Sequence, residues 1–291
     1  MASALGLSSN TFDPDKDIPD LDGKVYVVTG GSAGIGYGIV AHLCNLEDLK
    51  QTDEVAKQLA QKLTRLDALV CNAGLGVGIY NETRDGIDSH MQVNVFAQAH
   101  LTLMLLPVLQ KTTDSRIVHQ SSYLHKGATT SMKLESLHEM NQDICAMLLY
   151  NRTKLAQILF LRQLYSRIKA TQFGTVTGNT GLPWINTTHP GGIKTDQQAQ
   201  AVEAYGSLGK IGVAVARPFL KDPVSQGCRS ALFAATSPDI ATEQVQNSLI
   251  VPDRKVVEPS KQALDKTLSQ NLWNLTKQVL ESKIGNLPCT T

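Results

Sequence analysis

A strand followed by a glycine-rich turn constrains the fold of this chain more than any other feature. Residues 24–30 read KVYVVTG, a short β-branched run that is typical of a buried strand. Residues 29–36 read TGGSAGIG, and helical spacing follows them. Glycines let the backbone turn tightly and approach a phosphate, whose negative charge is favoured by the free N–H groups at the start of a helix. The stretch therefore predicts a strand–helix turn that binds a nucleotide.

Further strands and helices alternate along the chain. We expect strands at 67–74, 116–122, 182–192 and 247–253, and helices at 46–63, 85–110, 143–169, 225–237 and 261–283. This alternation predicts an α/β fold, a Rossmann-like doubly wound parallel sheet. Residues 1–23 are expected to form an exposed N-terminal arm, and residues 24–291 a single domain that binds the dinucleotide and carries the catalytic residues.

Composition excludes several classes of protein. The net charge of the 291 residues is +1 and no Lys/Arg-rich run occurs, which argues against a nucleic-acid partner. The wholly apolar stretches fall short of the roughly 20 residues that span a bilayer. Five cysteines without paired spacing and an N-terminus without a secretory signal predict a cytoplasmic protein. We assign no metal ligand, and a homo-oligomer stays possible.

Tyr150 and Lys154 are candidates for acid–base chemistry. They are four residues apart in the expected helix and therefore share a face. A lysine ammonium stabilises a phenolate and brings the pKa of tyrosine toward the useful range. Tyr165 and Lys169 repeat the spacing about 22 Å further along the helix. Because ligands of such folds bind outside the carboxyl ends of the strands, we choose Tyr150 over Tyr165.

Six motifs occur in the order in which one family carries them. They are TGGSAGIG (29–36), NAG (72–74), Asn94 in MQVNVF, Ser122 in IVHQSS, YNRTK (150–154) and HPGGIKT (189–195). The chain resembles the short-chain dehydrogenases/reductases over about residues 24–255. Residues 83–107 and 150–161 look most like the branch of retinol-dehydrogenase-like and fungal tailoring enzymes.

The resemblance implies an NAD(P)-dependent oxidoreductase that interconverts a carbonyl and an alcohol on a small hydrophobic or secondary-metabolite-like substrate. Tyr150 would exchange a proton with the substrate oxygen, and Lys154 would tune Tyr150 and bind the nicotinamide ribose. Ser122, rather than Ser121, would hold the carbonyl oxygen, and Asn94 would anchor a water that relays protons to Lys154. Considered alone, Ser122 would be a turn residue and Asn94 a buried amide.

The resemblance also implies a set of cofactor contacts, with NADP favoured by the branch and NAD possible. Asn45 matches the family position that contacts adenine. Apolar residues in 123–142 and 196–222, among them Leu134 and Met140, suit a hydrophobic substrate. The implied contacts are Gly30, Ser32, Ile35, Gly36, Asn45, Asn72, Ala73, Gly74, Tyr150, Lys154, Pro190, Gly191, Ile193 and Thr195.

The chain is too short between the first two motifs. The family places two further strands and their helices between the positions of Thr29 and Asn72, yet only 43 residues separate these two here. One strand–helix–strand unit alone takes about 30 residues. We therefore expect that one such unit, with about two of the usual seven strands, is missing after the first strand and helix. The first strand would then be a hydrophobic edge that is prone to association.

This gap leaves two questions open. The strand end that distinguishes NAD from NADP falls in the missing unit, so the sequence does not state the preference. The unit could be absent from a natural short form or lost in a faulty gene model. An alternative function follows, a truncated member that binds the cofactor weakly and has a regulatory role or no catalytic role.

Overall fold

The structure is a computed structural model that describes residues 12–31, 45–174, 181–193, 197–216 and 223–285. Its centre is one six-stranded sheet in the order β1-β2-β3-β4-β5-β6. The first five strands are parallel and the sixth is antiparallel to the fifth. The strands are β1 (Tyr26–Val28), β2 (Ala68–Cys71), β3 (Arg116–Gln120), β4 (Trp184–Thr188), β5 (Leu249–Val251) and β6 (Lys255–Val257).

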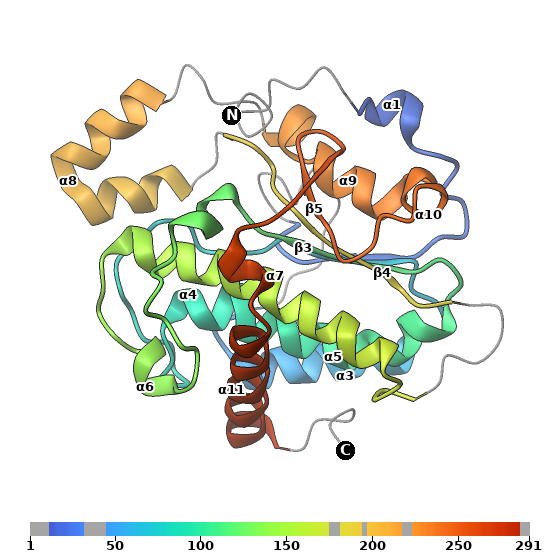
Figure 1. The fold of residues 1–291 in the computed structure, drawn as a ribbon, viewed down its shortest axis with the longest axis horizontal. Helices are drawn as coiled ribbons and strands as arrows, with labels where there is room; N and C mark the ends of the chain where they lie inside the picture. Colours follow the sequence, from blue (N-terminus) through green and yellow to red (C-terminus); the bar gives the residue numbers. More distant parts are fainter. Residues whose placement is uncertain (1–11, 32–44, 175–180, 194–196, 217–222, 286–291) are drawn as a thin grey trace.

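Helices cover both faces of the sheet, as Figure 1 shows. One face carries α3 (Leu49–Lys62), α5 (Ala97–Lys111), α7 (Ala146–Lys169) and α11 (Lys266–Ile284). The other carries α1 (Pro14–Asp17), α9 (Arg229–Thr236) and α10 (Asp239–Thr242). This arrangement confirms the predicted Rossmann-like α/β fold. The shorter or peripheral elements are α4 (Ser89–Met91), the π-helix η2 (Gln92–Phe96), η3 (Tyr123–Gly127), α6 (Leu137–Met140), α8 (Gln197–Ala216), η5 (Pro223–Gly227) and η6 (Lys261–Leu264).

The strand register brings the sequence motifs to one edge of the sheet. Val28 pairs with Val70, and Val70 with Val118, so the first three strands start and end together. Parallel strands present their carboxyl ends at the same edge. The segments 29–31, 72–74, 121–122 and 189–193, which follow β1 to β4, therefore meet there.

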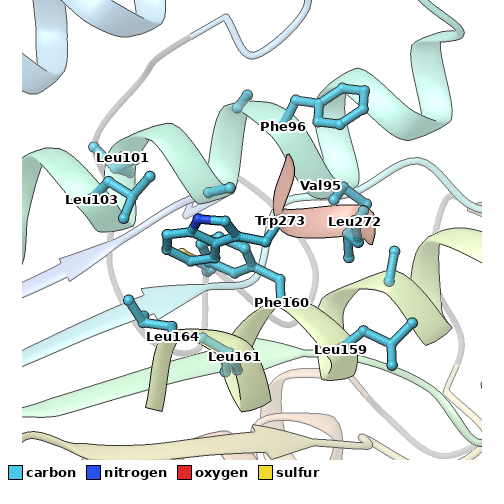
Figure 2. Packing of buried hydrophobic residues seen from close by; sticks show 14 of the residues in the cluster. Val95, Phe96, Leu101, Leu103, Leu159, Phe160, Leu161, Leu164, Leu272 and Trp273 are labelled. Carbon is cyan, nitrogen blue, oxygen red and sulfur yellow. The ribbon is translucent and has the colours of Figure 1, made fainter. Parts of the chain in front are cut away.

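Helix α11 is packed against the long helix α7 (Figure 2). The Trp273 ring lies parallel to the Phe160 ring, with centroids 5.6 Å apart. The Arg167 guanidinium covers the Trp273 ring at 4.6 Å. Apolar burial on both rings therefore fixes α11 to α7, the helix that carries Tyr150 and Lys154.

The N-terminal arm differs from the exposed arm expected for residues 1–23. Phe12 is fully buried and contacts the Phe233 ring edge-on, with centroids 5.7 Å apart. Its backbone N–H donates to Asp253. Residues 13–23 are exposed or half-buried. Phe12 therefore anchors the described part of the arm under α9, with Ile18 packed against the same cluster, because burial of a phenylalanine removes a large apolar area from water.

The segment between β1 and β2 bears on the missing unit. Its described part, residues 45–67, contains α3 and no strand. Within the described residues β1 pairs with β2 alone and so lies at one edge of the sheet. The absence of a strand–helix–strand unit stays a prediction, since residues 32–44 lie outside the described residues.

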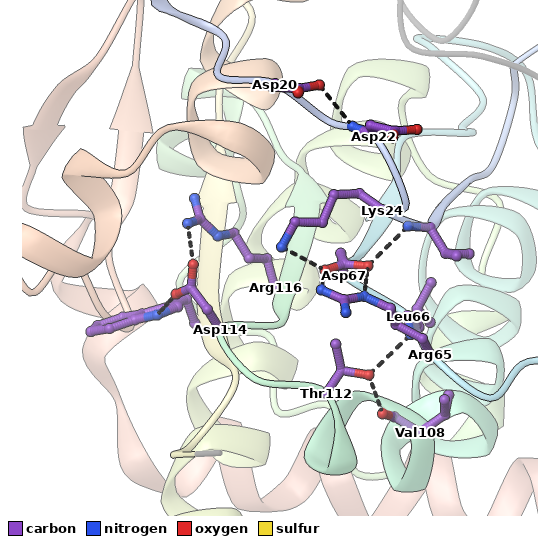
Figure 3. A network of polar contacts seen from close by, with 12 residues as sticks. Asp20, Asp22, Lys24, Arg65, Leu66, Asp67, Val108, Thr112, Asp114 and Arg116 are labelled. Carbon is purple, nitrogen blue, oxygen red and sulfur yellow. Dashed lines mark hydrogen bonds and ion pairs between the residues drawn. The ribbon is translucent and has the colours of Figure 1, made fainter. Parts of the chain in front are cut away.

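A buried carboxylate holds the start of β1 against β2 (Figure 3). Asp67 accepts two hydrogen bonds from Arg65, each 2.7 Å long, and one from the Val25 backbone N–H at 2.9 Å. Lys24 forms an ion pair with it at 3.2 Å. Burial alone would raise the pKa of Asp67, but these bonds outweigh it and lower the pKa below its ordinary value.

One helical run within the described residues is long and apolar enough to cross a membrane. Ser89–Lys111 comprises 23 residues, and its most apolar window has a mean hydropathy of 1.3. In the fold 94% of that window is buried. A core helix has the same composition, so the run is weak evidence for a span.

Candidate active site

Thr29 joins the glycine turn to the NAG segment. Its hydroxyl accepts hydrogen bonds from the backbone N–H groups of Asn72 and Ala73, both 3.0 Å long, and donates to Gln98. Gly30 has a φ of 70°, and an added Cβ would lie 2.9 Å from the Ala73 Cα. Only glycine permits this approach. The two segments therefore form one continuous surface.

Tyr150 lies buried near the start of α7, and its hydroxyl interacts with the side chain of Ser122. Ser121 lies differently, because its hydroxyl donates to the Lys154 carbonyl at 2.7 Å. The structure therefore brings the second serine of the pair to the tyrosine. Tyr165 lines a separate cavity with Asp114 and Trp184, at the starts of β3 and β4 and thus at the opposite edge of the sheet.

Lys154 is buried beside Tyr150, with its Nζ 5.3 Å from the centroid of the Tyr150 ring. The Nζ donates to the Gln120 carbonyl at 2.8 Å and to the side-chain oxygen of Gln157 at 3.1 Å. Burial lowers the pKa of Lys154 to about 7.

The acidification expected for Tyr150 does not appear. Burial raises the pKa of Tyr150 to about 12, against a smaller lowering by the hydrogen bond with Ser122. The reason is physical: a phenolate is costly in a dry site, and the Lys154 ammonium donates to two other oxygens.

Asn94 lies fully buried in η2 and orients the loop after the NAG segment. Its Oδ1 accepts from the Leu75 N–H at 2.7 Å, and its Nδ2 donates to the Leu75 carbonyl and to Thr153, both at 3.0 Å. An added Cβ at Gly74 would lie 2.9 Å from the Asn94 Oδ1 and 3.8 Å from the Lys154 Nζ. Because Gly74 has no Cβ, the side-chain amide of Asn94 and the ammonium of Lys154 can both lie close to its backbone.

Two histidines hold the turn that carries Ser122, and sequence reasoning assigned neither of them a role in the site. His125 accepts from the Ser260 N–H through Nε2 at 3.1 Å, so its Nδ1 carries the proton and donates to the Ser122 carbonyl at 2.8 Å. Burial lowers the pKa of His125, which keeps this ring neutral. His189 accepts from the Tyr123 N–H. The sequence offered one signal for each: His125 lies three residues after Ser122, and His189 is the first residue of HPGGIKT.

The other predicted cofactor residues lie in three places. Pro190, Gly191 and Ile193 follow β4, where Gly191 has a φ of 90° and Ile193 is buried against Gly227. Asn45 is exposed before α3, and its side-chain oxygen accepts from the Glu47 N–H at 3.1 Å. The predictions for Ser32, Ile35, Gly36 and Thr195 lie outside the described residues.

The described residues fit the nicotinamide end of a dinucleotide. Gly30 is exposed, and the absence of a Cβ at Gly30 and Gly74 lets Ala73 and the Asn94 side chain pack against their backbones. The buried ammonium of Lys154 and the hydroxyls of Ser122 and Tyr150 supply donors at the same edge of the sheet. Among the described residues, no group of three or more His, Cys, Asp or Glu side chains could hold a metal ion.

A parallel α/β sheet with a glycine turn, a serine, a tyrosine and a lysine at its carboxyl edge defines a class, the dinucleotide-dependent oxidoreductases. A family model described as short chain dehydrogenase matches residues 38–133. The chain is 33% identical to bli-4 of Neurospora crassa, named as a candidate mitochondrial oxidoreductase, over 97% of this chain and 77% of that protein. It is 31% identical to retinol dehydrogenase 14 of Homo sapiens, over 85% of this chain and 68% of that protein.

The chain belongs to the short-chain dehydrogenase/reductase family, and these relatives agree with the predicted branch. The fold is similar to a solved short-chain dehydrogenase from Burkholderia cenocepacia in complex with NADP, with a TM-score of 0.57 and 20% identity over 81% of this chain and 98% of that one. The alignment with bli-4 spans 329 positions, more than the 291 residues of this chain. That relative therefore carries residues without a counterpart here.

Proposed function

We propose that this protein is an NAD(P)-dependent oxidoreductase that reduces a carbonyl group or oxidises the corresponding alcohol. The observation that carries the proposal is the convergence of three side chains: the Tyr150 hydroxyl interacts with the Ser122 side chain, and the buried Lys154 Nζ lies 5.3 Å from the centroid of the Tyr150 ring. These three side chains come from β3 and α7 and meet at the edge of the sheet where the glycine turn lies.

Each side chain has one task in the proposed reaction. The nicotinamide, when bound, supplies or accepts the hydride. The Ser122 hydroxyl orients the carbonyl oxygen of the substrate, and Tyr150 gives that oxygen a proton during reduction. The raised pKa of Tyr150 keeps the phenol protonated at neutral pH, but it also makes the phenol a weak donor, so proton transfer needs a cation that stabilises the phenolate. Lys154 stabilises the phenolate that remains, so reduction requires its ammonium form.

Exposed apolar side chains around the pair support a hydrophobic substrate. Leu124 and Met147 are 41% and 37% exposed, and each lies within three residues of Ser122 or Tyr150. Tyr205 of α8 accepts a hydrogen bond from the Met147 N–H, which brings α8 to this place. Leu134 and Met140, which were expected to face the substrate, are fully buried in the core. We infer a small hydrophobic ketone, aldehyde or alcohol, as in secondary metabolism.

NADP is the proposed cofactor, and the cytoplasm the proposed compartment. The NADP proposal rests on the predicted family branch and on the similar dehydrogenase solved with NADP. The cytoplasmic proposal rests on five cysteines whose spacing in the sequence is not paired, and the mitochondrial name of one relative stands against it. Titration of the purified protein with NADPH and with NADH tests the cofactor. Tighter binding of NADH would reverse the preference, and no thermal shift with either at millimolar concentration would favour the cofactor-weak alternative.

Replacement of Tyr150 tests the proposed function. Tyr150→Phe removes the proton donor and keeps the ring, so we expect turnover of NADPH with hydrophobic ketones to fall by about 100-fold or more. Tyr165→Phe is the matched control, because it makes the same change at the far end of α7 and should leave turnover unchanged. A normal rate in Tyr150→Phe would refute the assignment.

A further inference from the structure

Gln157 links Lys154 to the backbone of Asn94. Its side-chain oxygen accepts from the Lys154 Nζ at 3.1 Å, and its Nε2 donates to the Asn94 carbonyl at 2.9 Å. The orientation of the amide is forced, because an ammonium can only donate and a carbonyl can only accept. Gln157 is 1% exposed and lies one helical turn after Lys154. The oxygen and the nitrogen of the Gln157 amide are therefore both hydrogen-bonded to residues of the site.

The ammonium of Lys154 has few other sources of stabilisation. None of the ion pairs between described residues includes Lys154. Its hydrogen-bond acceptors are the Gln120 carbonyl and Gln157, both neutral. The titratable groups facing it are Tyr150 on its own helix and His119 on β3, whose pKa burial lowers to about 3. Burial of an ammonium is costly unless dipoles of the protein replace water.

The geometry points to Gln157 as the positioning residue that keeps Lys154 protonated and holds it beside the Tyr150 ring. The inference rests on the proposed function, because it concerns the residue that supports the proton donor. Gln157 also binds the carbonyl of Asn94, the residue to which the family resemblance gives a relay water. A carboxamide neither gives nor takes a proton at neutral pH, so this link orients Lys154 and does not carry protons.

Two substitutions at Gln157 test the inference in opposite directions. Gln157→Leu removes the acceptor, so the Lys154 titration midpoint should fall by about one pH unit. Gln157→Glu keeps an acceptor, adds a charge and gives up the donation to Asn94, so the midpoint should rise by about one pH unit or more. The midpoint is measured by NMR on protein with ¹³C-labelled lysine side chains, with the Lys154 signal assigned through Lys154→Met.

The pH profile of kcat/KM is the second readout. Its high-pH limb, where Lys154 loses its proton, should move by the same amount and in the same direction as the NMR midpoint. Gln163→Leu is the matched control, since Gln163 lies on the same helix and contacts Gln270 at 2.9 Å, away from the site. This variant should leave both readouts unchanged. If Gln157→Leu does not fold, Gln157→Glu still decides the question.

The outcomes separate this inference from the proposed function. An unchanged Lys154 midpoint in both variants would overturn the role of Gln157, whether or not the enzyme turns over. A shifted midpoint with an unmoved rate profile would overturn the catalytic use of the contact. The NMR measurement needs no substrate, so it tests the contact even if no carbonyl compound is reduced.

Discussion

Glycine at position 74 lets two polar groups approach each other in a dry site. The Asn94 amide holds Leu75 by two hydrogen bonds, and the Lys154 Nζ lies near the same space. A methyl group added at position 74 would stand 2.9 Å from the Asn94 oxygen. The amide is fully buried in η2 and cannot swing into solvent.

We therefore predict that Gly74→Ala displaces the Asn94 side chain and lowers kcat/KM by about 100-fold, because small misplacements in a preorganised site are costly. Steady-state kinetics with NADPH measure this. Gly86→Ala is the control: Gly86 has a φ of 69° but open space around an added Cβ. It should cost about 1 kcal/mol of stability and no activity. Equal activities of the two variants would contradict the prediction.

At the scale of elements, β1 is three residues long and depends on contacts beyond its own ladder. Asp67 supplies them at the start of the strand, where it accepts from the Val25 N–H and pairs with Lys24 and Arg65 (Figure 3). At the other end of β1, the Thr29 hydroxyl supplies such contacts by accepting from the backbone N–H groups of Asn72 and Ala73. The glycine turn is therefore placed by two polar clusters, one at each end of β1.

Asp67→Asn should lower the free energy of unfolding by about 2–3 kcal/mol at neutral pH, because hydrogen bonds to a charged acceptor are lost. The pKa of Asp67 is lower folded than unfolded. Its contribution is therefore full above the unfolded value near 4 and is lost as the pH falls through the folded value. Urea unfolding from pH 7 to pH 3 should show the two proteins converging in acid. A constant difference would contradict this.

At the scale of the whole molecule, the sheet ends at β1 and β6, and no other described strand pairs with the outer edge of the parallel strand β1. Thr29 N–H donates to Val70 and the Val25 carbonyl accepts from Ala68, so alternate residues of β1 face β2. The N–H groups of Tyr26 and Val28 therefore point to the outer edge. Such edges recruit further strands.

We predict that the protein associates through β1 as its concentration rises, which sedimentation velocity would detect. Tyr26→Pro removes an outward N–H that an added strand needs and should abolish the association. Tyr26→Ala is the control for loss of the side chain and should still associate. A protein that stays monomeric at all concentrations would contradict the prediction.

The sequence located the site better than it described its electrostatics. Spacing and position along α7 separated Tyr150 from Tyr165 in the sequence, and in the structure Ser122, rather than Ser121, lies at the Tyr150 hydroxyl. The raised pKa of Tyr150, the commitment of Gln157 and the roles of His125 and His189 were not predicted. These depend on burial and on contacts between residues far apart in the chain, such as Gln157 with Asn94 and His125 with Ser260, which no local pattern records.

What the sequence determined by itself was the alternation of strands and helices and the order of the motifs, because hydrophobic period and glycine placement act within a few residues. What only the tertiary structure decided was the chemistry of the site. Burial shifts the pKa values of Lys154 and Tyr150, so their charge states depend on how much water the packed helices exclude. They also depend on which dipoles replace that water, and those dipoles come from β3, η2 and α7 together.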